Sequence, residues 1–121
     1  MINNLKVINK EDLINEVKSM ADREARLVVM TCVDLGNSFE ISYYFSILPS
    51  LELEVLRLTI SENEELPSIT GIYLCALINE NEIKEFYGVK ISGLAVDYNG
   101  HLFLSKDSPE TPMRKPKKEV Q

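Results

Sequence analysis

Three acidic residues lie close together in the stretch INENEIKEFYGV (residues 78–89): Glu80, Glu82 and Glu85. Two carboxyl groups that converge on one cleft can act as general acid and general base, as in glycoside hydrolases. On a helix, Glu82 and Glu85 share one side because residues three apart are neighbours, and that side lacks apolar residues. No nucleophile, base and orienting group accompany them, so the pair is more typical of a solvated helix face than of a catalytic site.

Glu80 differs from the other two acids because it falls along the apolar stripe of the same predicted helix. A carboxylate buried without a partner is costly, or its pKa shifts and it becomes neutral. We therefore expect Glu80 to meet a cation, backbone N–H groups or a polar seam with another subunit. Arg26, Arg57 and Lys84 are the candidate cations within the chain. The alternative is that Glu80 sits at the edge of the stripe and reaches water.

Cysteine and histidine residues are too few and too far apart for a metal centre. Cys32 and Cys75 are 43 residues apart, no CxxC is present, and His101 is the single histidine. Structural zinc and iron–sulfur clusters require several such ligands at short spacing. We expect both cysteines to be small buried hydrophobic residues and His101 to be structural. The chain is predicted to carry no cofactor and no metal.

The charge is unevenly distributed along the chain. The net charge is −6, but residues 1–104 carry 8 Lys or Arg against 16 Asp or Glu, whereas residues 105–121 carry 5 against 3. An acidic body argues against nucleic acid as a partner, because such binding relies on neutralising phosphates. The apolar runs are far shorter than a membrane span, and the N-terminus lacks a signal-peptide layout. We therefore expect a cytoplasmic location.

The first half of the chain has the periodicity of one helix followed by strands. Acids in the first turn and apolar residues at spacings of three, four and seven predict a helix over residues 10–24. β-branched or alternating runs predict three strands, at residues 26–36, 39–48 and 51–60. A change of phase in the third run predicts a bulge near Val55 and Leu56. The expected fold is α+β, with an antiparallel three-stranded meander packed against helices.

The second half has a second helix, short strands and a tail. The stretch SENEELP is typical of a polar loop, and Pro67 and Ser68 indicate the start of a second helix. Gly88 is expected to end this helix, because glycine adopts the left-handed conformation at little cost. Short strands follow, with a turn at Asn99-Gly100. Three prolines and few apolar residues make residues 105–121 an extended or disordered partner-docking tail. We expect a single domain over residues 1–104.

A motif closes the second predicted helix and reads Glu80-Asn81-Glu82-Ile83-Lys84-Glu85-Phe86-Tyr87-Gly88-Val89, after the lead-in Pro67-Ser68-Ile69-Thr70. It resembles the signature of the thirty-kilodalton subunit of respiratory NADH:quinone oxidoreductase, which is E-R-E, two residues, an acid, two large apolar residues, Gly and an aliphatic. Asn81 replaces the arginine of that signature, and Leu94 stands near the position of a histidine-containing stretch of the respiratory subunits. The segment SGLAVDYNGHLFLSKDSPETPMRK is more similar to the small soluble subunits of energy-converting, membrane-bound nickel–iron hydrogenases.

The resemblance implies a scaffold subunit without a redox centre, with no activity of its own, in the cytoplasmic arm of a membrane-associated redox complex. Its partners would be the large catalytic subunit and the iron–sulfur subunit, and it would reach the membrane only through them. The acids would brace the helix and meet basic groups on a neighbour, and the tail would lie along the large subunit. The implied interface residues are Glu80, Glu82, Glu85, Tyr87, Gly88, Pro112, Arg114 and Lys115.

Two other functions remain as alternatives. The chain could be a free-standing α+β module that binds a small ligand or self-associates through its sheet. It could also be a small hydrolase that uses Glu82 and Glu85 or Cys75, although the required set of catalytic groups is missing. The tail separates the first alternative from a subunit, because only a subunit needs it to contact a partner.

Overall fold

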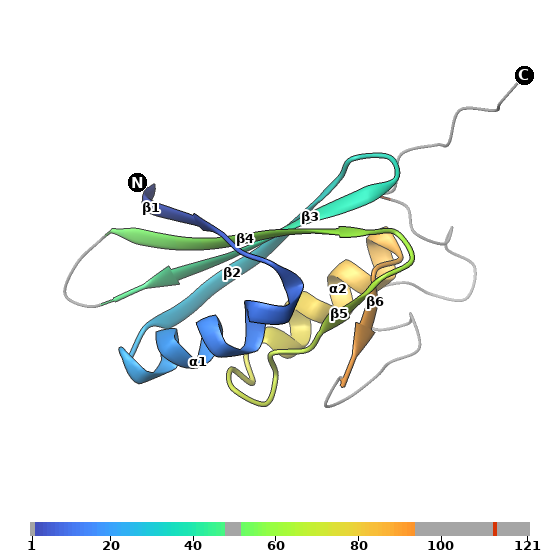
Figure 1. The fold of residues 1–121 in the computed structure, drawn as a ribbon. Coiled ribbons are helices and arrows are strands. Elements are labelled where there is room, and N and C mark those ends of the chain that lie inside the picture. Colours follow the sequence, from blue (N-terminus) through green and yellow to red (C-terminus); the bar gives the residue numbers. More distant parts are fainter. Residues whose placement is uncertain (1, 48–51, 94–112, 114–121) are drawn as a thin grey trace, which may run out of the picture.

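Two layers make up the part of the chain that the computed structural model describes, which is residues 2–47, 52–93 and 113. The larger sheet has four strands and the smaller one has two. Figure 1 shows both helices and the smaller sheet on one face of the larger sheet. The elements are β1 Ile2–Val7, the 3-10 turn η1 Lys10–Asp12, α1 Leu13–Asp22, β2 Arg26–Asp34, β3 Ser38–Ser46, β4 Leu53–Ser61, β5 Glu65–Pro67, α2 Ala76–Tyr87 and β6 Lys90–Ser92.

The large sheet is mostly antiparallel and has the order β1-β4-β3-β2. β2 pairs with β3, and β3 with β4, in antiparallel fashion, so the predicted meander and the α+β class are confirmed. The predicted first helix is confirmed as η1 and α1 together. β1 was not predicted, and it lies parallel to β4 at the edge of the sheet.

The hydrophobic core fills the space between the sheet and the helices. α1 contributes Leu13, Val17 and Met20, all of them buried. Phe39, Ile41, Tyr43 and Phe45 of β3, and Leu56, Leu58 and Ile60 of β4, point into the same core. These residues alternate along each strand, and that alternation makes one face of the sheet apolar. No helix within residues 2–47 and 52–93 has the length and apolar character needed to cross a bilayer.

The predicted bulge at Val55 and Leu56 is wrong. β3 and β4 pair without a shift of register along their whole length. Leu56 therefore points into the core, while Val55 lies on the opposite face, where Leu5 and Tyr44 are its cross-strand neighbours. Val55 is buried at that position without leaving the regular ladder. Register shifts occur instead in β1 and between Leu27 and Val29 of β2.

The chain between β4 and α2 also differs from the prediction. Residues 65–67 are not polar loop but β5, which pairs in parallel with β6, and Leu66 is fully buried there. The second helix begins at Ala76 rather than near Pro67. The Ser68 N–H donates to the Ser92 carbonyl (2.8 Å), and the Ile69 N–H donates to Glu80, so both residues are bonded outside any helical ladder.

The two cysteines have different surroundings. Cys32 packs, half-buried, against the core, and burial, with a further contribution from the charge of Asp34, raises its pKa to about 12. Cys75 is exposed just before α2, so the prediction that it is a buried hydrophobic residue is wrong. His101 lies outside the described residues.

Gly88 ends α2 in the left-handed conformation, with φ 77° and ψ 19°, and its N–H donates to the Lys84 carbonyl (3.0 Å). A side chain in this conformation costs about 1–2 kcal/mol. We therefore expect Gly88→Ala to lower the free energy of unfolding by about that amount in urea titrations. Gly71→Ala is the matched control, because Gly71 has no positive φ and open space where its Cβ would lie. Equal stabilities of the two variants would contradict this prediction.

Candidate functional site

Glu80 is fully buried on α2, and its carboxylate is bonded to the segment that precedes the helix. The Ser68 hydroxyl donates to its Oε1 (2.7 Å), and the Ile69 N–H donates to its Oε2 (3.1 Å). Ser68 Oγ also lies 2.8 Å from Thr70 Oγ1 and accepts from the Thr70 N–H (3.2 Å). The expectation that Glu80 needs a partner is confirmed, and one of its partners is the backbone N–H of Ile69.

The cations considered for Glu80 do not hold it. Arg57 pairs with Glu40 (3.3 Å) and donates to Ser42, on the other face of the sheet. The pKa of Glu80 is raised by burial, against which the hydrogen bonds from Ser68 and Ile69 act to lower it. The site is therefore a buried carboxyl held by neutral donors rather than an ion pair.

Tyr43 of β3 faces the same buried region. Its pKa is raised well above the ordinary value, first by burial and then by the negative charge of Glu80. Its hydroxyl is buried and makes no hydrogen bond to any group that the structure describes. Nothing in the local sequence pattern indicates that these two groups are close, because they are far apart in the chain.

The other two acids of the motif do not share a solvated face. Glu82 is exposed, whereas Glu85 is buried, so the prediction of a common solvent-facing side is wrong for Glu85. Asn81, which stands where the signature has arginine, is buried and donates through Nδ2 to the Leu77 carbonyl (2.9 Å). It therefore bonds within its own helix. Glu82 therefore faces solvent, whereas Glu80 and Glu85 are buried.

The C-terminal end of α2 receives one contact from the tail. The Met113 N–H donates to the Phe86 carbonyl (2.9 Å), one of the last carbonyls of the helix. Tyr87 is half-buried, and its pKa is raised by burial first and by the charges of Cys32, Glu82 and Asp34. Pro112, Arg114 and Lys115 lie outside the described residues.

An apolar ridge lies beside Glu82 at the other end of the helix. Leu74 precedes α2 by two residues and Ile78 lies on its first turn, and both are exposed. Leu74, Ile78 and Glu82 follow one another at intervals of four residues, so Ile78 and Glu82 are neighbours on the surface of α2. Glu82 makes no ion pair with another described residue. This combination can bind an apolar surface that carries a basic group at its edge.

Tyr73 fixes the segment that carries Leu74. Its hydroxyl donates to the Ala25 carbonyl (2.5 Å), and its ring lies 5.6 Å from the ring of Phe45 in a tilted arrangement. Together with Glu80, Tyr73 ties residues 68–75 to both α2 and the large sheet. The ridge is therefore held in a fixed position rather than carried on an unsupported loop.

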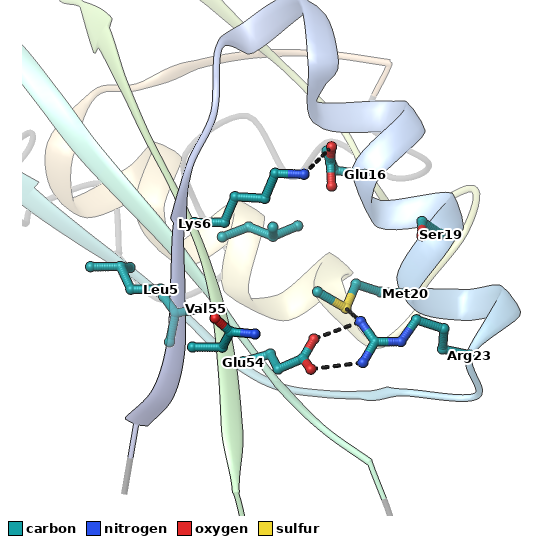
Figure 2. Close-up of a pocket in the computed structure, with 10 residues that line it drawn as sticks. Leu5, Lys6, Glu16, Ser19, Met20, Arg23, Glu54 and Val55 are labelled. Atoms are coloured by element: carbon teal, nitrogen blue, oxygen red, sulfur yellow. Dashed lines mark hydrogen bonds and ion pairs between the residues drawn. The ribbon is translucent and has the colours of Figure 1, made fainter.

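A cleft of about 350 Å³ lies elsewhere, between β1 and α1. Figure 2 shows Lys6 reaching Glu16 at one end and Arg23 paired with Glu54 at the other. The Lys6–Glu16 distance is 2.7 Å, and both Arg23–Glu54 hydrogen bonds are 2.7 Å. The pKa of Glu54 is lowered, chiefly by the hydrogen bond from Arg23. Because each of these cations is already paired with a carboxylate, the cleft offers no unpaired charge to a ligand.

Metal binding has no donor set in the part of the chain described. No group of three or more His, Cys, Asp or Glu side chains within residues 2–47 and 52–93 is arranged to hold a metal ion. The geometry around α2 instead supports a rigid, partly apolar surface. A surface of this kind can bind another macromolecule.

Comparison with known proteins gives this surface its context. The sequence profile of the family described as respiratory-chain NADH dehydrogenase, 30 Kd subunit, matches residues 6–119. The chain belongs to this family. The resemblance inferred from the motif is thereby confirmed at the level of the family.

A solved structure shares the fold of this family member. It is the membrane-bound sulfane sulfur reductase (MBS), an archaeal respiratory membrane complex, one chain of which superposes with a TM-score of 0.74 at 17% identity. The match covers 88% of this chain and 65% of that chain. At this identity the likeness shows the fold alone. The description of the family to which the chain belongs names a subunit of the respiratory-chain NADH dehydrogenase.

Two curated relatives are named as DNA repair proteins and not as respiratory subunits. They are the DNA double-strand break repair helicases HerA of Sulfurisphaera tokodaii and Sulfolobus acidocaldarius, each 25% identical over 103 residues. The match covers 83% of this chain but 19% of either relative, so the chain spans about a fifth of their length.

Several residues of the site are not evident from the sequence. Ser68, Ile69 and Tyr43 surround Glu80, and only Ser68 and Ile69 belong to the lead-in of the motif. The available signal was the Ser-Ile-Thr stretch, in which two hydroxyl side chains flank an apolar residue shortly before a helix with an acid on its apolar stripe. Leu74 and Ile78 carry the weaker signal of apolar residues outside the main stripe.

Proposed function

We propose that this chain is a non-catalytic assembly subunit of a membrane-associated redox complex of the energy-converting hydrogenase or complex I type. It would pack against the large catalytic subunit and the cluster-bearing subunit, at the inner face of the membrane, and would reach the membrane only through them. The family match over residues 6–119 supports membership of such a complex. The similarity of the segment after Gly88 favours the hydrogenase branch.

The observation that carries this proposal is that two acids of the signature helix have different surroundings, one buried and one exposed. Its buried acid, Glu80, is used internally to hold Ser68 and Ile69. Its exposed acid, Glu82, lies beside the apolar side chains of Leu74 and Ile78. Paired charges at an interface mainly set orientation and partner choice, while apolar contacts supply most of the affinity. The ridge at Leu74, Ile78 and Glu82 therefore fits an apolar partner surface flanked by lysine or arginine.

A role with nucleic acid would follow from the names of the HerA relatives, but the charge of this chain opposes it. The net charge is −6, and the phosphate backbone is bound through lysine and arginine. The shared segment is a small part of those helicases. Their activity is therefore not proposed for this chain.

The proposal is tested by tagging the chain, solubilising native membranes gently, and identifying the proteins that copurify by mass. Recovery of a large hydrogenase-like or dehydrogenase-like subunit together with cluster-bearing proteins is the expected result. Recovery of the chain alone from the soluble fraction would contradict the proposal. It would favour the alternative of a free-standing module that binds a ligand or self-associates.

The tail gives a second test, since we propose residues 1–104 as the domain and residues 105–121 as a docking segment. A chain truncated at Lys106 is expected to keep the thermal unfolding transition of the full chain. It should recover the partner subunits about tenfold less efficiently, which corresponds to a loss of about 1.4 kcal/mol of contact free energy. Full-strength assembly of the truncated chain would show that the tail is dispensable. A variant with the tail present but with Thr111→Ser is the matched control.

A further inference from the structure

The exposed side of α2 carries a narrow apolar ridge that ends in an acid. Leu74 is 68% exposed and Ile78 is 49% exposed, and Glu82 is exposed one turn farther along. The Leu77 N–H donates to the Leu74 carbonyl (3.0 Å), so the turn before α2 continues the helical path and keeps Leu74 in line with Ile78. Side chains four residues apart on a helix are neighbours, so the three form one row about 12 Å long.

Cys75 widens the apolar part of this ridge. It is exposed, follows Leu74 in the chain and precedes Ile78 by three residues. The residues that flank the row on α2, Leu77 and Asn79, are only partly exposed, so the row stands above them. Free cysteine, leucine and isoleucine are usually buried, and a contiguous exposed group of such residues is typical of an interaction site. The extended ridge therefore comprises Leu74, Cys75, Ile78 and Glu82.

Glu82 gives one end of the extended ridge a negative charge. Its carboxylate makes no ion pair with another described residue. A carboxylate that is covered by an apolar surface without a cation is costly. A partner that covers the apolar side chains of Leu74 and Ile78 therefore needs a lysine or arginine about one helical turn away, where it can pair with Glu82.

A second copy of this chain does not meet that need. Two copies related by a twofold axis bring the same surface of each copy together. If the two helices run antiparallel and cross at Ile78, Glu82 of one copy faces Leu74 of the other. If they run parallel, the two Glu82 carboxylates face each other. Neither arrangement supplies a cation, and both bury a carboxylate at a cost, so the extended ridge is not self-complementary.

The shape of the extended ridge favours a helix as the partner element. A row of side chains at intervals of four residues packs into the groove between the equivalent rows of a second helix, with the two axes about 8–10 Å apart. Such a groove is lined by side chains at intervals of three and four residues, so a basic residue one turn beyond the apolar ones can reach Glu82. A sheet presents a broad face instead, which a single row contacts only along its crest.

We propose that the extended ridge packs into a groove on an α-helix of another subunit, and that a lysine or arginine of this helix pairs with Glu82. This inference rests on the proposed function and names the partner element that the ridge binds. Glu80 and Tyr73 hold residues 68–75 against α2 and the large sheet, so the ridge has its shape before the partner binds. A surface that is already in its bound conformation loses less entropy on association.

The first test replaces Cys75 of the full chain by the photo-crosslinking residue p-benzoylphenylalanine, in cells that make the native complex. Cys75 is exposed, so the larger side chain needs no space in the core. We expect the captured peptide to come from another subunit, with apolar residues at intervals of three and four and a lysine or arginine one turn away. The matched control has the same replacement at Ser19, an exposed position of α1, and should not capture this peptide. A captured peptide of this chain itself, a peptide with alternating apolar residues, or no capture while partner subunits copurify would overturn the inference.

The second test reverses the charge at the end of the ridge. Glu82→Lys is expected to lower the recovery of the captured subunit from native membranes about tenfold, and a change of the captured lysine or arginine to glutamate should restore it. Glu11→Lys is the matched control, because it makes the same charge change at an exposed position of η1, and it should match the wild type. Loss without rescue, or equal loss in the control, would overturn the inference. If the wild-type chain recovers no other subunit at all, it is the proposed function that fails.

Discussion

Glu80→Ala is expected to lower the free energy of unfolding by about 2–4 kcal/mol, because the change removes the acceptor of the buried Ile69 N–H and of the Ser68 hydroxyl. A buried donor left without a partner costs about 1–3 kcal/mol. The shortened side chain also leaves a cavity, because Glu80 is fully buried. Urea titration followed by circular dichroism measures this loss.

Glu82→Ala is the matched control for Glu80→Ala. Glu82 lies on the same helix with the same side chain, but it is exposed and makes no ion pair with a described residue. Its replacement by alanine is expected to change stability by no more than about 0.5 kcal/mol. If both variants lose the same stability, the bonds between Glu80 and residues 68–69 do not support the fold.

The same carboxyl makes the stability depend on pH. Burial raises the pKa of Glu80, so the folded protein holds this proton more tightly than the unfolded chain does. The resulting stabilisation is fully present below the unfolded pKa of about 4.3 and is lost as the pH rises through the folded pKa. Glu80→Gln has no such titration. Its stability relative to the wild type should therefore increase with pH above about 4.3, and a constant difference from about pH 4 to pH 7 would contradict this reasoning.

Glutamine also suits the geometry. Its side-chain oxygen can accept from the Ile69 N–H, and its amide N–H can donate to Ser68 Oγ. Ser68 can then turn its hydrogen toward Thr70 Oγ1, 2.8 Å away. Every partner of the wild-type carboxylate thus stays bonded. The comparison between glutamine and alanine separates the loss of hydrogen bonds from the effect of charge.

Periodicity was enough to predict the elements that pack against the core over long stretches. α1, β2, β3 and β4 all show it, and the left-handed Gly88 was predicted from its place after the helix. β1 was missed for two reasons. Its polar residues obscure the alternation, and the formation of a parallel edge strand depends on pairing with a distant strand, as in the pairing of Ile2 with Leu53. β5 was missed because it is too short for any period to show. Local patterns do not contain these distant pairings.

The candidate site was predictable only in part, for a related reason. An acid on an apolar stripe correctly predicted that Glu80 needs a partner. Which partner it finds depends on where residues 68–75 are held, and hydrogen bonds from Ser68 to β6 and from Tyr73 to Ala25 hold them. Glu85 was predicted to be solvated from its place on the helix alone, whereas its burial depends on what packs against α2.

Tyr43→Phe is expected to raise the free energy of unfolding by about 1–2 kcal/mol, because the Tyr43 hydroxyl is buried without a hydrogen-bond partner among the described groups. Removing such a group avoids the cost of taking it out of water, which is about 1–3 kcal/mol, and leaves only a small gap in the core. The change also takes a buried hydroxyl away from the region of Glu80, whose charge raises the pKa of Tyr43.

Tyr73→Phe is the matched control, because it removes the same group, a tyrosine hydroxyl, at a position where this hydroxyl does have a hydrogen-bond partner. Tyr73 donates to the Ala25 carbonyl at 2.5 Å, so its loss is expected to cost about 1 kcal/mol. The two variants should therefore shift the urea midpoint in opposite directions. A loss of stability in Tyr43→Phe would show that this hydroxyl is bonded in solution, to a buried water or to Glu80 itself. The polar region beneath α2 would then be a connected network rather than a carboxyl held only by Ser68 and Ile69.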